Sequence, residues 1–220
     1  MSASVRPLYL IFTDGSAMST SENGKFFGND ITVTGYAYAI CNVETRKIAY
    51  DSGTCGNRIV YYAEIYAIYK GLARLAYKLE GKEVDVIVVS DNKACVKSLT
   101  EYMDRWKIKY KGKKWKVSAS DIYHNINELM TLNPNMRVHV VHMHSHKDGR
   151  YVTELKSTLR VYNVCLTRKA ARFFININKN VDKSAHREAR ADLKMFRNNL
   201  MCLDYVDDLE IPWGSIEDWK

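Results

Sequence analysis

Residues 8–16 have the sequence LYLIFTDGS, in which an uncharged, β-rich run meets an Asp-Gly-Ser turn signal. A short apolar run of this kind is typical of a buried strand, and the turn signal predicts that the strand stops at Asp14. Outward from this stretch, residues 31–43 and 47–52 have the composition of two further strands. The N-terminal part of the chain therefore predicts an antiparallel meander.

A helix and a second buried strand follow the meander. Over residues 60–79, apolar side chains recur at three- and four-residue spacing, which predicts an amphipathic helix lying on a sheet. Residues 83–89 (EVDVIVV) predict a buried strand that ends at Ser90-Asp91, and a helix is expected over residues 93–107. This strand, helix, strand order is that of an α/β domain.

The C-terminal part of the chain is less regular. A helix over residues 120–130 and an alternating strand over residues 137–143 are predicted. Residues 144–182 mix a charged loop, a helix near residues 163–174 and a polar run. Ser184 is expected to cap a final helix.

Composition limits the class of protein. The chain has 220 residues, of which 46% are hydrophobic and 26% charged, so a disordered or fibrous protein is excluded. No run reaches the roughly 18 apolar residues of a spanning helix, and no basic segment followed by an apolar run opens the chain. The five cysteines form no Cys-x-x-Cys pair. We expect a cytoplasmic monomer with reduced thiols and no membrane partner.

The positive charge is concentrated in one segment. The chain has 33 lysines and arginines but only 25 aspartates and glutamates, and this excess of positive charge favours a polyanionic partner. Residues 105–116 (RWKIKYKGKKWK) carry seven of these cations, two tryptophans, one tyrosine and no acid. A surface that neutralises phosphates and packs on sugars has this composition. The alternative is a solvated loop with buried tryptophans.

Three carboxylates occupy special positions. Asp14 ends the first predicted strand, Glu64 lies early in the first long helix, and Asp91 ends the fourth predicted strand. The carboxyl ends of neighbouring parallel strands face one crevice, so Asp14 and Asp91 are expected to converge there. Carboxylates that converge without a cation bind hard divalent metal ions or share protons.

Together these motifs resemble the type 1 ribonucleases H. The resemblance rests on Thr13-Asp14-Gly15-Ser16, Gly35, Ala63-Glu64 and Ser90-Asp91, and it covers roughly residues 7–146. It implies an α/β, ribonuclease H-like fold, in which helices flank a five-stranded mixed sheet. It also implies endonucleolytic hydrolysis of the RNA strand of RNA–DNA hybrids with two Mg²⁺ ions, for which Mn²⁺ can substitute.

The resemblance also implies residue roles. Asp14 would bridge both metal ions, while Glu64 and Asp91 would hold the ion on the leaving-group side. His146, in the loop after the last predicted strand, would shuttle a proton or help the product leave, with His144 as its competitor. An imidazole suits that role because it titrates near neutrality.

Substrate contacts are assigned by the same resemblance. The basic, tryptophan-containing segment looks like the substrate-binding handle of the family, and Asn57 is a candidate for reading ribose 2′-hydroxyls. The handle candidates are Tyr102, Trp106, Lys107, Lys109, Lys111, Lys113, Lys114 and Trp115.

Two registers compete for the fourth carboxylate. If Asn163 matches the asparagine that precedes the last aspartate of the family, Thr167 takes the aspartate position and the metal site is incomplete. If Arg190-Ala191-Asp192-Leu193 matches instead, Asp192 completes it, and we favour this register. The ribonuclease H-like domain then comprises residues 1–146 plus about 184–202, residues 147–183 are an insertion, and residues 203–220 form an acidic tail.

Other functions remain open at this point. A proofreading exonuclease of the same fold is expected to have Asp-x-Glu where this chain has Asp14-Gly15-Ser16. An integrase-type nuclease would share the carboxylates but lack the Ala-Glu helix together with the basic handle. A catalytically weakened hybrid-binding or scaffold domain is the third alternative, and it would have lost one metal ligand.

Overall fold

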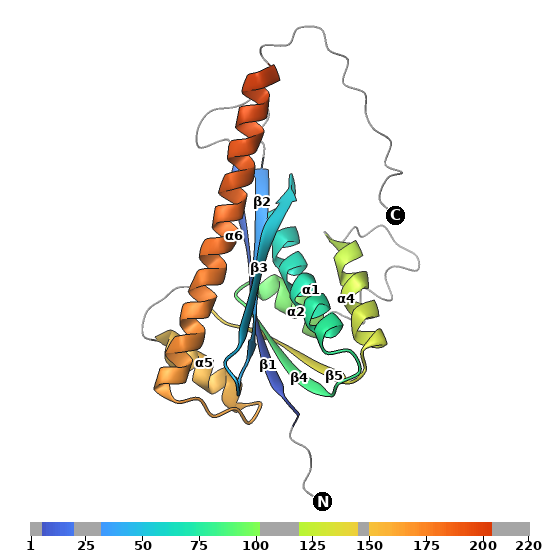
Figure 1. Cartoon of the computed structure of the whole chain (residues 1–220), viewed down its shortest axis with the longest axis vertical. Helices are drawn as coiled ribbons and strands as arrows, with labels where there is room; N and C mark the ends of the chain where they lie inside the picture. The colour runs from blue at the N-terminus through green and yellow to red at the C-terminus, as the bar shows by residue number, and fades with distance from the viewer. Residues whose placement is uncertain (1–5, 20–31, 102–118, 145–149, 204–220) are drawn as a thin grey trace, which may run out of the picture.

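The computed structural model describes residues 6–19, 32–101, 119–144 and 150–203. Five strands form one sheet in the order β3-β2-β1-β4-β5 (Figure 1). The β1/β2 and β2/β3 pairs are antiparallel, whereas β1/β4 and β4/β5 are parallel. The strands are β1 (Leu8–Ser19), β2 (Thr32–Asn42), β3 (Ile48–Gly56), β4 (Val84–Ser90) and β5 (Met136–His142). The predicted five-stranded mixed sheet is confirmed.

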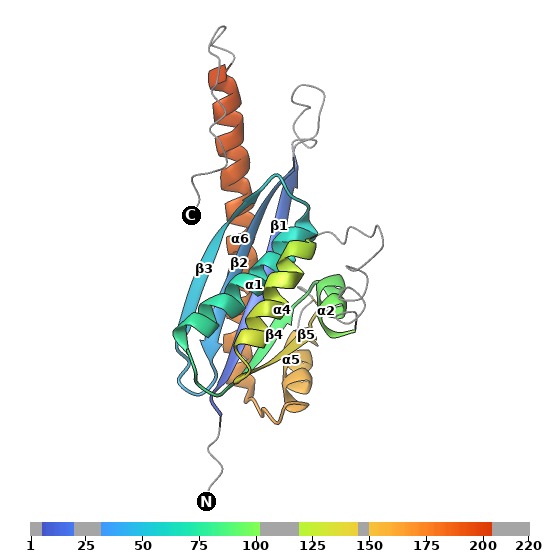
Figure 2. The same ribbon diagram turned by 90° about the vertical axis from the view of Figure 1, so that its right-hand side faces the viewer.

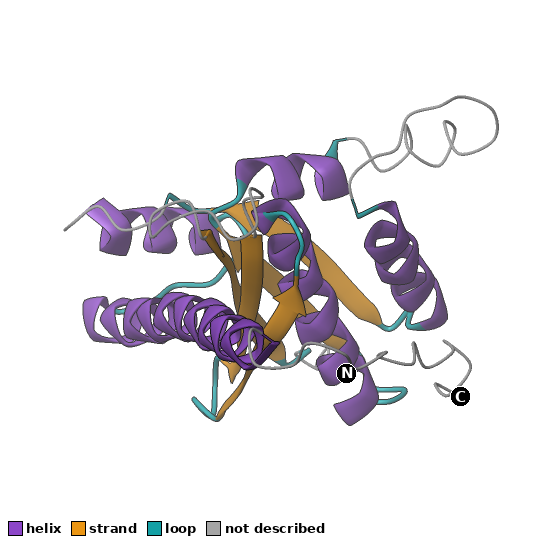
Figure 3. Ribbon diagram, turned by 90° about the horizontal axis from the view of Figure 1, so that it is seen from above, coloured by secondary structure: helices purple, strands orange, loops and turns teal. Residues whose placement is uncertain are grey.

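Helices cover both faces of this sheet (Figures 2 and 3). One face packs against α1 (Val60–Lys78), α2 (Lys93–Thr100) and α4 (Ser120–Leu132), and the other against α5 (Arg150–Arg160) and α6 (Arg168–Leu203). Side chains of β1 alternate between the two cores, with Ile11 in the first and Leu10 and Phe12 in the second. Within the described residues, no helix has the length and apolar character needed to cross a membrane.

Strand β1 continues past the predicted stop at Asp14. Its parallel pairing with β4 ends at Phe12 and Val89, but its antiparallel pairing with β2 continues to Ser19. Gly15 is therefore not a turn residue. A Cβ atom at this position would lie 2.5 Å from the backbone nitrogen of Glu64, so the glycine allows the start of α1 to lie directly on β1.

Helix α6 lies across β2 and β1 on the opposite face. A Cβ atom at Gly35 would lie 2.4 Å from the backbone oxygen of Ala185, so a glycine is required for this close approach. The expected helix start at Ser184 is wrong, because Ser184 lies inside α6. The helix instead begins after Thr167, whose Oγ1 accepts a hydrogen bond of 3.1 Å from the backbone nitrogen of Ala170.

The expected insertion over residues 147–183 is an integral part of the core. Tyr151, Leu155 and Leu159 of α5 are buried against the same sheet face as Phe174 of α6. These three α5 residues recur every four positions, as one face of a helix requires. The expected boundary at residues 183–184 falls inside the continuous helix α6. Residues 204–220 of the expected acidic tail lie outside the described residues.

Candidate functional site

Three carboxylates converge where β1 extends beyond β4. Asp14 comes from β1, Glu64 from the first turns of α1, and Asp91 from the residue after β4. One carboxylate oxygen from each lies within 4.8 Å of the others. This is the spacing of oxygen ligands around a divalent cation.

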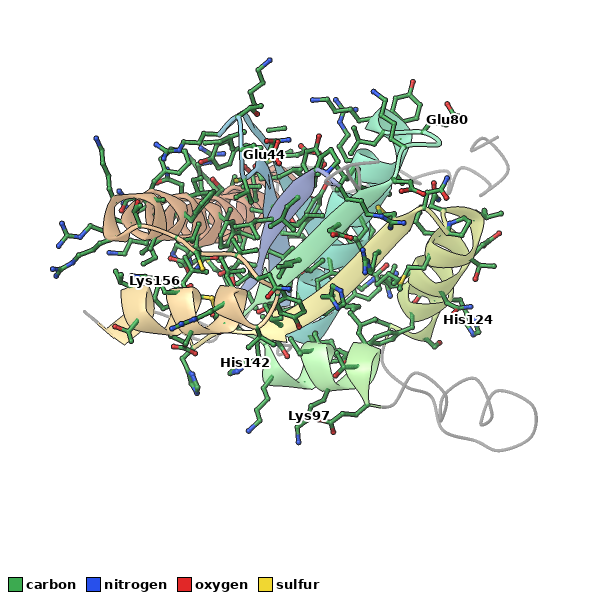
Figure 4. All side chains as sticks on the ribbon, turned by 90° about the horizontal axis from the view of Figure 1, so that it is seen from below. Glu44, Glu80, Lys97, His124, His142 and Lys156 are labelled. Atoms are coloured by element: carbon green, nitrogen blue, oxygen red, sulfur yellow. The ribbon has the colours of Figure 1, made fainter. Side chains whose placement is uncertain are left out.

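Hydrogen bonds to the backbone fix the position of Asp91 between β4 and α2. The Asn92 side chain accepts hydrogen bonds of 3.1 Å from the backbone nitrogens of Ala94 and Cys95, which caps α2. His142 on β5 forms a hydrogen bond of 3.0 Å from Nε2 to the carbonyl oxygen of Asp91. Because a carbonyl only accepts, Nε2 of His142 carries the proton. Figure 4 shows His142 at the end of β5, between α2 and α5.

Glu64 supplies a test of whether a cation fits. Its side chain is 5% exposed, and its Oε2 atom is buried without a hydrogen-bond partner among the described residues. A buried carboxylate oxygen without a partner is unfavourable in the absence of a positive charge. The donor set contains only hard oxygens, which suit Mg²⁺ or Mn²⁺. The residues present therefore fit a divalent cation.

Burial and mutual repulsion raise the pKa values of two carboxyl groups in the cluster. Burial, followed by the charges of Asp91 and Asp182, raises the pKa of Asp14 to about 8. Burial, followed by the charges of Asp14 and Asp91, raises the pKa of Glu64 well above its usual range, although a hydrogen bond from Asn92 opposes the shift. Without a cation, the cluster thus holds protons that a metal ion would displace.

A fourth carboxylate, Asp182 of α6, joins the cluster. A side-chain hydrogen bond links it to Asp14, which requires a proton on one of the two groups. Sequence reasoning missed this residue, although a signal was present. Asn178 precedes Asp182 by four residues, which is the same spacing as that of Asn163 and Thr167.

The structure does not bring Asp192 to this cluster. Asp192 lies ten residues beyond Asp182 in α6, about 15 Å further along the helix axis. There it faces the end of β3, where burial and, to a smaller extent, the charge of Asp192 raise the pKa of Cys55 to about 11. The expected register depended on a helix start at Ser184, which the continuous helix rules out. Asp182 therefore replaces Asp192 as the candidate fourth ligand, and Thr167 caps α6 instead.

The histidines differ in their surroundings. The ring of His144 lies 4.8 Å from that of His142, and its Nδ1 is 2.8 Å from a carboxylate oxygen of Glu154. His186, one turn beyond Asp182, was not singled out from the sequence, and its Nδ1 lies 3.3 Å from Ser16 Oγ. His146 lies outside the described residues.

The predicted substrate contacts are largely untested. Asn57 is exposed in the bend between β3 and α1. The handle candidates all lie outside the described residues; they are Tyr102, Trp106, Lys107, Lys109, Lys111, Lys113, Lys114 and Trp115.

A mixed sheet in the order β3-β2-β1-β4-β5, with carboxylates gathered beside β1 and β4, defines a ribonuclease H-like protein. The chain matches the RNase H family over residues 7–154, about two thirds of its length, and it belongs to that family. The resemblance to the ribonucleases H is confirmed. No curated protein sequence matches the chain.

Solved structures show the same fold. The PFV RNase H domain in solution is 18% identical, with a TM-score of 0.55, and the match covers 85% of this chain and 97% of that domain. The native prototype foamy virus protease-reverse transcriptase is 17% identical, with a TM-score of 0.57 over 86% of this chain. The foamy viral protein in complex with an RNA/DNA hybrid is 16% identical, with a TM-score of 0.51 over 83% of this chain. This chain spans about a fifth of the length of those two proteins, 22% and 20%.

Proposed function

We propose that this chain is an endoribonuclease that hydrolyses the RNA strand of RNA–DNA hybrids with divalent metal ions. The observation that carries the proposal is the convergence of Asp14, Glu64 and Asp91 within 4.8 Å, with Asp182 hydrogen-bonded to Asp14. Membership of the RNase H family supports it. The foamy viral structure with an RNA/DNA hybrid supports the choice of substrate.

The four carboxylates would hold two Mg²⁺ ions, or Mn²⁺ in their place. Asp14 is the candidate bridging ligand, because it interacts electrostatically with Asp91 and Asp182 and also with Glu64. When bound, the two ions supply an activated water on one side of the phosphodiester and stabilise the leaving oxygen on the other. The protein keeps Glu64 buried and holds Asp91 through its backbone, so the ligands are positioned before any ion arrives.

The remaining predicted residues would bind substrate or move protons. His146 is the candidate for proton transfer or product release, and Asn57 for contact with a ribose 2′-hydroxyl. The handle, residues 105–116, would bind phosphates through its lysines and pack on sugars through Trp106 and Trp115.

The position of Asp182 bears on the alternative of a catalytically weakened hybrid-binding domain. That alternative requires the loss of a metal ligand. With Asp182 of α6 as the candidate fourth carboxylate, beside Asp14, the proposed ligand set would lack no acidic side chain. The presence of this candidate supports the proposal of an active enzyme over that of a scaffold domain.

The test is incubation of the purified chain with matched RNA–DNA hybrid, double-stranded RNA and double-stranded DNA, with Mg²⁺ or with EDTA. We expect cleavage of the RNA strand of the hybrid and of neither control duplex. This cleavage should occur in Mg²⁺ and not in EDTA. Asp182→Asn should cleave the hybrid far more slowly, while Asp192→Asn, the same change on the same helix, should cleave it at nearly the rate of the unmodified chain. Hybrid binding without cleavage under all these conditions would instead identify a scaffold domain.

A further inference from the structure

Helix α5 contacts α6 next to the lower end of that long helix (Figure 1), and a basic groove lies between the two. It is a hollow of about 620 Å³. Its lining includes four cationic side chains and no acidic one; the cations are Lys156, Arg168, Arg172 and Lys179. We call this feature the α5–α6 groove.

Little negative charge offsets the cations of the groove within the described residues of α5 and the first part of α6. Residues 150–181 contain seven lysines and arginines and a single acid, Glu154. Glu154 is already paired with Nδ1 of His144 at 2.8 Å. None of the four groove cations has an ion pair with a carboxylate in the described part of the chain. A concave surface with one sign of charge concentrates counter-ions, so the groove favours an anionic ligand.

One end of the groove lies at the carboxylate cluster. Tyr151 and Asn178 line it, and Asn178 Nδ2 donates a hydrogen bond of 2.6 Å to the Tyr151 hydroxyl, which joins α5 to α6. Burial, followed by the charges of Asp91, Glu154, Asp14 and Asp182, raises the pKa of Tyr151, so three acids of the cluster act on this residue electrostatically. Asn178 lies one helical turn before Asp182. The groove therefore begins about one helical turn of α6 from the candidate ligand Asp182.

The length of the groove indicates what kind of anion it suits. From Asn178 to Arg168 is ten residues of α6, about 15 Å along the axis. One strand of a nucleic-acid duplex carries a phosphate about every 3.4 Å of axis, so this length matches about four nucleotide steps. A second hollow of about 640 Å³ shares Thr153 and Lys156 with the first and adds Arg160. A row of cations of this length suits a phosphate backbone better than a single small anion.

We propose that the α5–α6 groove binds the phosphate backbone of the nucleic-acid strand that passes through the carboxylate cluster, beyond the phosphate to be cleaved. The inference rests on the proposed function for the identity of the substrate. It assigns to α5 and the start of α6 a second basic surface, separate in sequence from the handle. The groove would hold the strand beyond the cluster, which helps to fix its register at the reacting bond.

The test compares two double variants that each remove two exposed cations. Lys156→Ala with Arg172→Ala removes two groove cations, while Lys169→Ala with Lys194→Ala removes two cations of α6 that line neither hollow. Hybrid binding is measured in EDTA, where no cleavage is expected, over a series of salt concentrations. For the groove variant, the slope of log K against log salt should fall by about 0.7–0.9 for each phosphate that the variant no longer neutralises. The control variant should keep the slope of the unmodified chain. An unchanged slope in the groove variant, or an equal fall in the control, overturns the proposal.

A second measurement locates the binding surface on the substrate. Hybrids are shortened from one end or the other, up to the cleavage site. The groove variant should bind as well as the unmodified chain when the end that reaches the groove has been removed, and more weakly when that end is present. The same deficit on both shortened hybrids overturns the proposal.

The two proposals can fail separately. If the unmodified chain binds hybrid with the predicted slopes but never cleaves it in Mg²⁺, the groove stands and the nuclease function fails. If it cleaves hybrid while the groove variant retains the full salt slope, the nuclease function stands and the groove proposal fails.

Discussion

The two helical layers bring their carboxylates to the sheet in different environments. Helix α1 meets β1 at Gly15 and places Glu64 in the core, where it is 5% exposed. Helix α6 crosses β2 at Gly35 and places the half-buried Asp182 beside Asp14, next to the α5–α6 groove. One helical layer thus supplies a buried ligand and the other a more accessible one. Asp14 is the residue that both layers share.

Replacement of the shared residue should have the largest effect. Asp14→Asn removes a charge from the centre of the cluster without changing its shape, so stabilisation of several kcal/mol in the transition state is lost. We expect the rate of hybrid cleavage to fall by at least about 10³-fold, while hybrid binding in EDTA and the far-UV circular dichroism spectrum stay unchanged. Full activity in this variant would falsify the metal-site assignment.

Replacement of Asp182 should lower the cleavage rate less than replacement of Asp14 does. It should lower the rate far more than replacement of Asp192 on the same helix. Asp182→Asn is expected to lower the cleavage rate by about 10²-fold, with a higher Mg²⁺ requirement. Asp192→Asn makes the same chemical change about 15 Å away along α6 and should alter the rate less than about twofold. Rates over a Mg²⁺ titration compare the two. If Asp192→Asn were the more damaging change, the assignment of Asp182 would be wrong.

The candidate ligands also differ in how well the sequence predicts them. Asp14, Glu64 and Asp91 each stand next to a strong local pattern: an apolar strand, an amphipathic helix and a valine-rich strand. Asp182 lies in the polar run that follows Phe174, where asparagines and β-branched residues have modest helix propensity. Burial of one face of the helix against the sheet at each successive turn, rather than local preference, holds this run in α6.

The strand and helix boundaries are likewise predicted only where a local sequence pattern determines them. The helices predicted over residues 60–79 and 120–130 agree within two residues with α1 and α4, because their apolar spacing is complete in the sequence. The predicted end of β1 at Asp14 is too early, because an Asp-Gly-Ser signal ordinarily marks a turn. Pairing with β2 extends the strand to Ser19, and no pattern within β1 itself indicates that partner.

The packing of α6 on the sheet is expected to control stability. Gly35→Ala would place a Cβ atom 2.4 Å from the backbone oxygen of Ala185, so α6 must shift. We expect the free energy of unfolding to fall by about 1–3 kcal/mol, together with a loss of activity as Asp182 moves away from Asp14. Gly53→Ala on β3 is the control, since the atoms nearest to its Cβ would belong to a side chain, that of Tyr36, at 3.0–3.2 Å, rather than to backbone. Urea denaturation measures both, and an equal loss in the two variants would contradict a special role for Gly35.

The pH dependence of stability separates the protonated cluster from the metal-bound one. The pKa of Asp14 is raised from 3.8 to about 8 in the fold, so between these values the folded state binds a proton that the unfolded state does not. In EDTA this contribution is present below about pH 4 and is lost as the pH rises towards 8. The Tm of the unmodified chain should therefore fall more over this range than that of Asp14→Asn. Thermal melts of both variants check this, and Mg²⁺ should raise the Tm more at pH 8 than at pH 5. Parallel pH profiles for the two variants in EDTA would contradict the raised pKa.

The link between α5 and α6 should give the smallest effect. Tyr151→Phe removes the hydroxyl that accepts a hydrogen bond from Asn178 Nδ2, while the ring, 9% exposed, keeps its packing. We expect a loss of about 1 kcal/mol in the free energy of unfolding, the usual value for one hydrogen bond. Asn178→Ala alone and the double variant complete a double-mutant cycle, in which the two changes should not add, because each removes the same bond. If the groove depends on this link, Tyr151→Phe should also raise the KM for long hybrids more than for hybrids shortened on the groove side, with kcat little changed. Additive losses in the cycle would show that the two side chains act independently and that α5 is held to α6 by apolar packing alone.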